Sequence, residues 1–203
     1  MNKSRPWSVI GIALPVLFTV QGAWAGPPTD QLRPAVERVI RIIQDAALKG
    51  EGRAAERRGA IRNVSDGIFA WREMAKRSLG AHWRARTEAE REEFVRLFRD
   101  LLERRYVSTI ERYSGERITY SGDSVDGNQA IARTKFLTRQ GQEIAIDYRM
   151  MRQGDRWLIY DVLVENVALV GNYRTQFNQI IRTSSFEELV NKLRGHEFVK
   201  EAS

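Results

Sequence analysis

The sequence predicts an α+β fold in which a curved antiparallel sheet of about four strands is wrapped by helices. Three observations lead to this fold class. Apolar residues recur with a period near 3.6 as far as Tyr113, with a period of 2 between Arg117 and Val164, and with a period near 3.6 again beyond Val167. Runs of helices that are separate from a run of strands are typical of α+β domains.

Two helical regions are expected before the sheet. The first spans Thr29 to Lys49, where apolar side chains fall at helical spacing and Lys49-Gly50 provides a stop. The second spans Arg53 to Leu79, with Gly59 and Gly67 as its possible breaks.

A third helix is predicted to start after Thr87, because Thr87 and Glu90 form a capping box in which each side chain satisfies a free backbone N–H. The helix is expected to run to about Tyr113 and to present a broad apolar stripe. The stripe consists of Phe94, Leu97, Phe98, Leu101, Leu102, Tyr106, Ile110 and Tyr113.

Four strands are predicted to follow, joined as a meander by short turns that contain Gly, Asp and Asn. They are Arg117 to Ser121, Gln129 to Arg139, Gln142 to Met151 and Arg156 to Val164. Alternation along the third strand places Ile144, Ile146, Tyr148 and Met150 on one face. In the fourth strand, Tyr160 and Val162 are expected to share a face. Both faces of that strand are largely apolar, so it should be covered on both sides.

The chain is expected to return to helix from about Val167 to Arg182 and then to form a short last helix. Ser185 followed by Glu188 predicts the cap of that helix, and Gly195 predicts its end. No repeat, low-complexity stretch or linker divides the sequence, so a single domain is expected.

The first 25 residues have the features of a cleavable signal peptide. Lys3 and Arg5 form a short positive segment, Val9 to Val20 form an apolar run, and Ala23-Trp24-Ala25 is a cleavage site of the small-x-small type. The apolar run is broken by Pro15 and is shorter than the ~20 residues that a transmembrane helix needs. A retained membrane anchor is therefore the less favoured alternative.

The mature chain, residues 26–203, is expected to work outside the cytoplasm as one domain. It contains no cysteine, which excludes disulfides, thiolate metal sites and a cysteine nucleophile, and an exported protein of this kind suggests a bacterial periplasm. Removal of two of the 33 basic residues, against 26 acidic ones, lowers the formal charge from +7 to about +5. Because the two signs are interspersed, the pattern indicates solvated helix faces and argues against a nucleic-acid partner.

No catalytic motif and no metal site is recognisable in the sequence. His82 and His196 fall in neither a metal spacing nor a serine triad pattern, and no phosphate loop, dinucleotide fingerprint or calcium loop is present. Asp147 and Asp161 lie in adjacent strands within mostly apolar runs, so an acid–base role is conceivable. The favoured alternative for each aspartate is structural, as the partner of an arginine such as Arg149 or of a helix N-terminus.

Three stretches carry a resemblance to a known family. They are Phe-Ala-Trp-Arg-Glu-Met-Ala at 69–75 with Ser-Leu-Gly-Ala-His-Trp at 78–83 and the helix start as far as Phe98, then Asp-Tyr-Arg-Met at 147–150 with Trp157 to Val162, and finally 164–170 with Asn172 to Phe177. In these stretches the chain resembles the MlaC family, also called the toluene-tolerance auxiliary family. Two positions depart from the family's Glu-Gly-Val-Ser segment, since this chain has Asn166 and Ala168 there.

The resemblance implies an NTF2-like fold, with a curved sheet and helices that enclose an apolar pocket for acyl tails. It also implies a periplasmic phospholipid shuttle that needs no cofactor and maintains outer-membrane lipid asymmetry. The implied partners are an inner-membrane ABC transporter with an MCE-type substrate-binding subunit and an outer-membrane lipoprotein/porin complex. Two competing functions remain open: an isomerase or dehydratase on the same fold with Asp147 or Asp161 as base, and a scaffold protein with a filled core.

Thirteen residues are candidates for the lining of a lipid pocket, each chosen for its apolar face together with the implied function. They are Phe94, Phe98, Leu101, Tyr106, Ile144, Ile146, Tyr148, Tyr160, Val162, Val167, Val170, Tyr173 and Phe177. Arg149 and Arg174 are candidates to touch a phosphate at the pocket mouth, with exposed surface charge as the favoured alternative. Two acyl tails require a cavity toward the upper end of the usual range of about 300 to 1,000 Å³.

Overall fold

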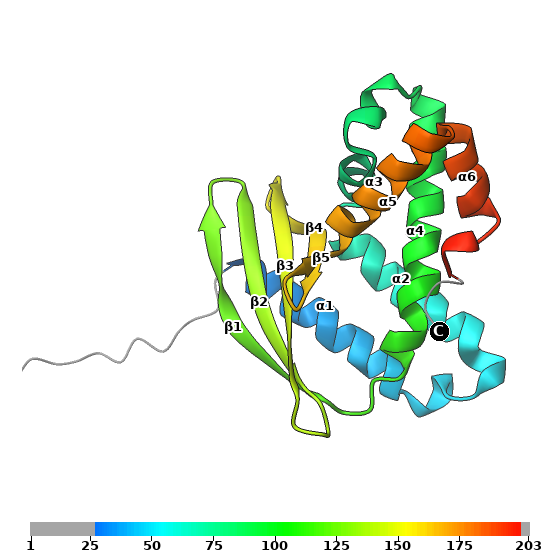
Figure 1. The fold of residues 1–203 in the computed structure, drawn as a ribbon. Helices are drawn as coiled ribbons and strands as arrows, with labels where there is room; N and C mark the ends of the chain where they lie inside the picture. Colours follow the sequence, from blue (N-terminus) through cyan, green and yellow to red (C-terminus); the bar gives the residue numbers. More distant parts are fainter. Residues whose placement is uncertain (1–26, 200–203) are drawn as a thin grey trace, which may run out of the picture.

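The structure, a computed structural model, describes residues 27–199, so the expected signal peptide lies outside the described residues. Helices come first, then an antiparallel sheet, then helices again, which confirms the predicted α+β class (Figure 1). The sheet is open and its strands follow chain order, β1-β2-β3-β4-β5. Within residues 27–199, no helix is both long and apolar enough to cross a membrane.

The helices follow the predicted ranges closely. They are α1 (Pro27–Gln44), α2 (Ala54–Ile68), α3 (Trp71–Leu79), α4 (Glu88–Glu111), α5 (Leu169–Thr183) and α6 (Phe186–Arg194). The second helical region breaks at Phe69 and Ala70, whereas Gly59 and Gly67 both lie inside α2. The Ala70 N–H donates to the Ile159 carbonyl at 2.8 Å, so a bond to the sheet takes the place of a helical one.

Both predicted helix caps are confirmed. The Thr87 hydroxyl accepts the Glu90 N–H at 3.3 Å, and the Glu90 carboxylate accepts the Thr87 N–H at 2.6 Å, which completes the capping box of α4. The Ser185 hydroxyl accepts the Glu188 N–H at 3.1 Å at the start of α6. These side chains satisfy backbone donors that a helix start leaves without partners.

The four predicted strands are present, and a short fifth strand extends the sheet. The bounds are β1 (Arg117–Asp126), β2 (Gln129–Leu137), β3 (Glu143–Gln153), β4 (Arg156–Val164) and β5 (Val167–Ala168). The tight turn between β4 and β5 has positive φ at Glu165 (49°) and Asn166 (65°). Two-residue hairpin turns need this backbone, and asparagine tolerates it better than most residues. Asn166 is therefore compatible with the turn in spite of its departure from the family pattern.

A β-bulge in β4 overturns one expectation about the sheet faces. Arg149 pairs with Asp161, but the next residue of β3 pairs with Ile159, so Tyr160 is an extra residue on its strand. An extra residue shifts the alternation by one position. As a result, Tyr160 and Val162 lie on opposite faces of the sheet and not on one face as alternation predicted.

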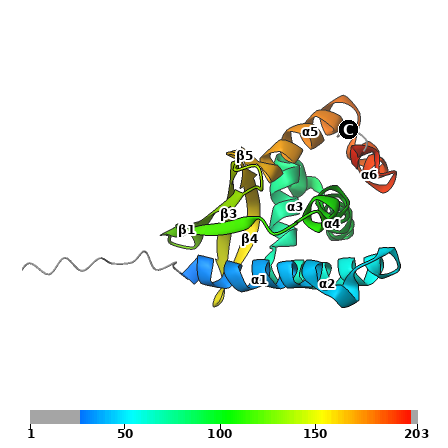
Figure 2. The same ribbon diagram turned by 90° about the horizontal axis from the view of Figure 1, so that it is seen from below.

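Helices cover both faces of β4, as the two-sided apolar pattern of this strand predicted. Trp157 and Ile159 pack in one cluster with Leu32 of α1 and Ile68 of α2. On the other face, α3 and α5 contact β4. Figure 2 shows α1 and α2 in one layer and α5 and α6 on the opposite side, with α3 and α4 between them.

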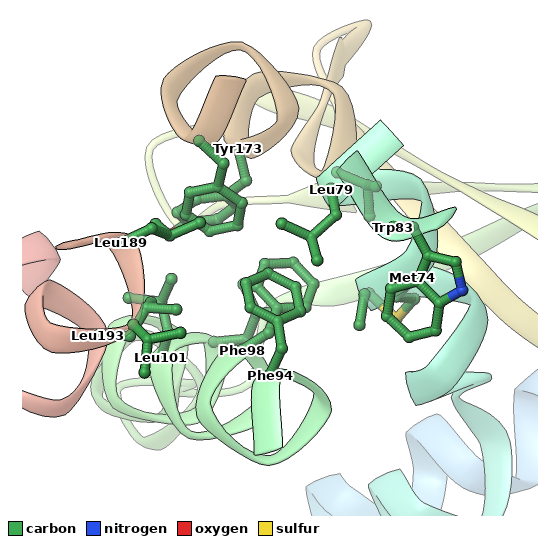
Figure 3. Packing of buried hydrophobic residues seen from close by; sticks show 14 of the residues in the cluster. Met74, Leu79, Trp83, Phe94, Phe98, Leu101, Tyr173, Leu189 and Leu193 are labelled. Atoms are coloured by element: carbon green, nitrogen blue, oxygen red, sulfur yellow. The ribbon is translucent and has the colours of Figure 1, made fainter. Parts of the chain in front are cut away.

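A second hydrophobic core joins the helices α3 to α6. Figure 3 shows that Phe94 and Phe98 of α4 point toward Tyr173 of α5 and toward Leu189 of α6. Phe94 and Phe98 are fully buried. Phe98 meets Tyr173 edge-to-face, with ring centroids 5.6 Å apart, an arrangement that aromatic rings favour.

Candidate functional site

An apolar cavity of about 470 Å³ lies between α1, α2 and one face of the sheet. From α1, the lining includes Leu32, Ala35, Val36, Val39, Ile40 and Ile43. These residues recur every three to four positions, so they form one stripe along the helix. From the sheet, the lining includes Ile118, Phe136, Ile144, Tyr148 and Ile159. Helix α1 therefore forms one wall of the cavity, and the sheet forms the opposite wall.

The length of the cavity matches that of an acyl tail. The α1 residues from Leu32 to Ile43 line it, and eleven helical steps correspond to about 16 Å. The hydrocarbon core of a bilayer is about 30 Å thick, so one leaflet, and thus one tail, spans about 15 Å. An extended acyl tail fits along the α1 stripe.

The charged lining residues and most of the polar ones gather at one end of the cavity. Thr109 and Arg112 come from the end of α4, Glu116 precedes β1, and Thr138 follows β2. Arg112 and Glu116 are the charged members of the described lining. Hydrogen bonds from the N–H and the hydroxyl of Ser114 hold the pKa of the Glu116 carboxyl below its ordinary value. This end therefore has the character of a mouth, whereas Leu32 and Ile159, both 1% exposed, lie at the closed end.

An ion-pair group joins α2 to α4 beside the mouth. The Glu111 carboxylate lies 2.8 Å from the Arg57 guanidinium and 3.2 Å from that of Arg58. Burial alone would raise the pKa of Glu111, but hydrogen bonds from Arg58 and Arg57 outweigh it and lower the pKa. The carboxylate is thus ionised and fixed where the last turn of α4 meets the first turns of α2.

Replacement of Glu111 by glutamine is expected to lower the free energy of unfolding by about 1–2 kcal/mol at neutral pH, because two arginines lose their shared partner. A carboxyl group whose pKa is lowered in the folded state contributes stability above its unfolded pKa, and this contribution is lost as the pH falls through the folded pKa. The difference in unfolding free energy between wild type and E111Q, measured with urea, should therefore be full at pH 7 and should shrink as the pH falls below about 4. A difference that does not shrink as the pH is lowered would contradict this assignment. The control is Glu92→Gln, which changes an exposed carboxylate on the same helix.

Of the thirteen residues predicted to line the site, Ile144 and Tyr148 line this cavity. Burial raises the pKa of the Tyr148 phenol, so this wall of the cavity stays neutral. Val162 packs beside Tyr148 as its cross-strand partner without joining the lining. Ile146 pairs with Val164 on the same strands, also outside the lining.

The other predicted lining residues lie elsewhere. Six of them pack in the filled helical core: Phe94, Phe98, Leu101, Tyr106, Tyr173 and Phe177. Tyr160 and Val170 border a different cleft on the far face of the sheet, together with both candidate phosphate ligands, Arg149 and Arg174. Val167 is 61% exposed on β5. The structure thus does not bring these residues together around one space.

Sequence reasoning missed the contributions of α1 and α2 to the lining. The stripe from Leu32 to Ile43 was visible as helical periodicity, and Ile61, Val64 and Ile68 of α2 were visible in the same way. Periodicity identifies the buried face of a helix, but it does not say whether that face meets a cavity or a filled core.

Asp161 has the structural role that was expected as the alternative to an acid–base role. Its carboxylate accepts the N–H of Val162 and that of Val170 at 2.9 Å each, and the Arg149 guanidinium lies 3.4 Å away. Val170 belongs to the first turn of α5, so Asp161 ties β4 to a helix N-terminus. Asp147 lies opposite Arg133 in the sheet. In residues 27–199, no three His, Asp or Glu side chains come close enough together to hold a metal ion.

Fold and site together define a class of protein: an α+β protein whose helices and open sheet enclose an elongated, neutral cavity with a polar mouth, suited to an apolar ligand. The family model described as "MlaC protein" matches residues 33–195. The chain belongs to the MlaC family.

Two relatives agree with this assignment. The chain is 22% identical over 121 residues to the intermembrane phospholipid transport system binding protein MlaC of Haemophilus influenzae, a match that spans 57% of this chain and 56% of that protein. It is also similar in fold to a phospholipid-binding protein from Ralstonia solanacearum, solved in complex with a phospholipid. The TM-score is 0.74 and the identity 20%, over 83% of this chain and 96% of that one.

Proposed function

We propose that this chain binds a phospholipid. An acyl tail lies in the apolar cavity, and the headgroup lies at the mouth formed by Arg112, Glu116 and Thr138. The observation that carries the proposal is the elongated apolar cavity with its charges at one end. A lipid has the same division, since its tails are apolar and its headgroup is polar. The phospholipid held by the structural relative from Ralstonia solanacearum supports the same cargo.

The cavity must widen to hold two tails. Its volume of about 470 Å³ lies within the usual range for ligand sites but below the upper end expected for a diacyl lipid. The start of α1 is held to the sheet, because the Thr29 N–H donates to Asp123 at 2.9 Å and the Trp157 N–H donates to Gln31 at 2.8 Å. Widening is therefore assigned to the C-terminal half of α1, which lies nearer the mouth.

Exchange with a membrane should be close to balance. Shelter from water is worth about 0.8 kcal/mol per methylene, or about 24 kcal/mol for a lipid with roughly 30 methylenes. A bilayer shelters the same tails almost equally well, so this large term cancels between carrier and membrane. The direction of transfer must then be set by the proteins that meet the carrier at each membrane.

In this proposal the chain is a periplasmic shuttle of an ABC-transporter-linked system that maintains outer-membrane lipid asymmetry, exported by the signal peptide expected at residues 1–25. Its partners would be an inner-membrane transporter with an MCE-type subunit and an outer-membrane lipoprotein/porin complex. In this proposal the carrier is not an enzyme. Of the two candidate bases, Asp161 is engaged with Arg149 and with the start of α5, and Asp147 lies opposite Arg133 in the sheet. A scaffold with a filled core is disfavoured by the cavity itself.

A lipid-transfer assay tests the shuttle. Residues 26–203 are added to donor vesicles that contain a fluorescent phospholipid and to unlabelled acceptor vesicles. We expect the transfer rate to rise in proportion to protein concentration, because each molecule carries its own cargo. A rate that stays at the spontaneous value at every protein concentration would exclude a carrier that acts without its partners.

A further inference from the structure

A second cleft, of about 680 Å³, lies on the far face of the sheet from the apolar cavity, between α3, the start of α5 and strands β3 and β4. Its lining is strongly basic. It includes the cationic side chains Lys76, Arg77, Arg84, Arg149 and Arg174 and a single carboxylate, that of Asp161.

The local carboxylates do not neutralise this cleft. Asp161 is 5% exposed and its carboxylate is already occupied by Arg149 and two backbone N–H groups. Lys76 and Arg77 share one neighbour, Glu73, at 3.4 Å and 2.8 Å. In the described part of the chain, no carboxylate lies within 4 Å of the guanidinium of Arg84 or of Arg174. The cleft therefore keeps a net positive charge, to which the nearby N-terminus of α5 adds.

One of the cations, Arg77, is held by an aromatic ring, and another, Arg174, lies close to the backbone of Gly80. The Arg77 guanidinium lies over the Tyr160 ring, 4.0 Å from its centroid, on the residue that the β-bulge turns toward this face. The Arg174 side chain crosses the backbone of Gly80, where a Cβ atom would come within 2.9 Å of its Nε. Gly80 also has a φ of 57°, which favours glycine. A guanidinium group that is already ordered, as that of Arg77 is, loses less side-chain entropy when it binds an anion.

The cleft does not belong to the cargo cavity. The two spaces share no lining residue. The sheet separates the two spaces. Tyr148 and Ile159 face the cavity, whereas the next residue on each strand, Arg149 and Tyr160, faces the cleft. A headgroup at the mouth beside Arg112 cannot reach the cleft through the sheet.

We propose that the basic cleft is a docking site for an acidic polypeptide segment of a partner protein. The cations surround a cleft of about 680 Å³, which an extended polypeptide segment can enter but a flat membrane surface cannot follow. Four of the five cations are arginines, whose planar guanidinium groups match carboxylates in pairs of parallel hydrogen bonds. A carrier that must meet partners at two membranes would also gain faster encounter from such a field.

The test compares two double variants of residues 26–203 that lose equal charge. The cleft variant is Arg84→Gln/Arg174→Gln, and the control is Arg96→Gln/Arg182→Gln, two exposed arginines outside the cleft. Binding of a fluorescein-labelled oligoglutamate peptide is measured by anisotropy at low salt, and binding of phosphatidylglycerol vesicles by co-sedimentation. We expect the cleft variant to bind the peptide about tenfold more weakly than wild type and the control about twofold more weakly, since only the cleft arginines act together.

Vesicle binding is expected to fall equally in both variants, because it follows net charge. The proposal is overturned if wild type does not bind the peptide, or if both variants lose peptide binding equally. It is also overturned if the cleft variant loses vesicle binding selectively while it keeps the peptide, a result that would assign the cleft to a lipid surface.

Discussion

Replacement of Ile40 by glutamate is expected to abolish the retention of lipid. Ile40 belongs to the α1 stripe that lines the cavity and lies in its C-terminal half. A carboxylate there keeps its charge only if water enters, and a tail that displaces this water must bear the cost of desolvating it, which is about 3 kcal/mol or more. Such a cost corresponds to more than about a hundredfold loss of affinity. The measurement is the phospholipid extracted per mole of purified protein, by mass spectrometry.

Asn63→Glu provides the matched control for I40E. Asn63 is exposed on α2, outside the cavity lining, and its replacement adds the same negative charge to a helix. This control should keep its lipid. A folded I40E protein with a normal lipid content would show that the tails lie elsewhere.

Replacement of Phe98 by alanine is expected to lower the free energy of unfolding by about 3–5 kcal/mol and to leave the lipid content unchanged. Phe98 is 0% exposed, and its ring packs against those of Tyr173 and Phe177, with centroids at 5.6 Å and 5.7 Å. Truncation would leave a void in a filled core, with no cargo to occupy it. Urea unfolding at neutral pH gives the loss, and extraction of the same sample gives the lipid content.

The opposite outcome of F98A would support the sequence-based expectation that Phe98 faces the cargo. In that case the stability loss would fall well below 3 kcal/mol, since a cavity-lining ring is not fully packed. The lipid content would also change, because the pocket would grow. Phe94→Ala should behave as F98A does, since Phe94 is equally buried in the same cluster.

Local patterns in the sequence predict most of this fold. The capping box at Thr87 and Glu90, the switch of period after Ser114 and the cap at Ser185 each depend on residues close together in the chain. The break at Phe69 and Ala70 was missed because a bond to Ile159 causes it, and strand β4 is distant in sequence.

The residues predicted for the lipid pocket and those that line the cavity overlap in part, for a physical reason. Apolar stripes on α1 and α4 look alike in sequence, yet α1 covers a cavity and α4 fills a core with aromatic rings. Which stripe meets empty space depends on how the elements pack. The bulge at Tyr160 adds a second reason, since one extra residue moves a side chain from one face of the sheet to the other and cannot be read from alternation.

Native mass spectrometry of residues 26–203, purified without added lipid and followed by organic extraction, tests the central claim most directly. We expect a bound diacyl phospholipid in stoichiometric amount, because an empty apolar cavity of this size would be unfavourable. A protein that is isolated without lipid and also takes up none from vesicles would contradict the proposed function.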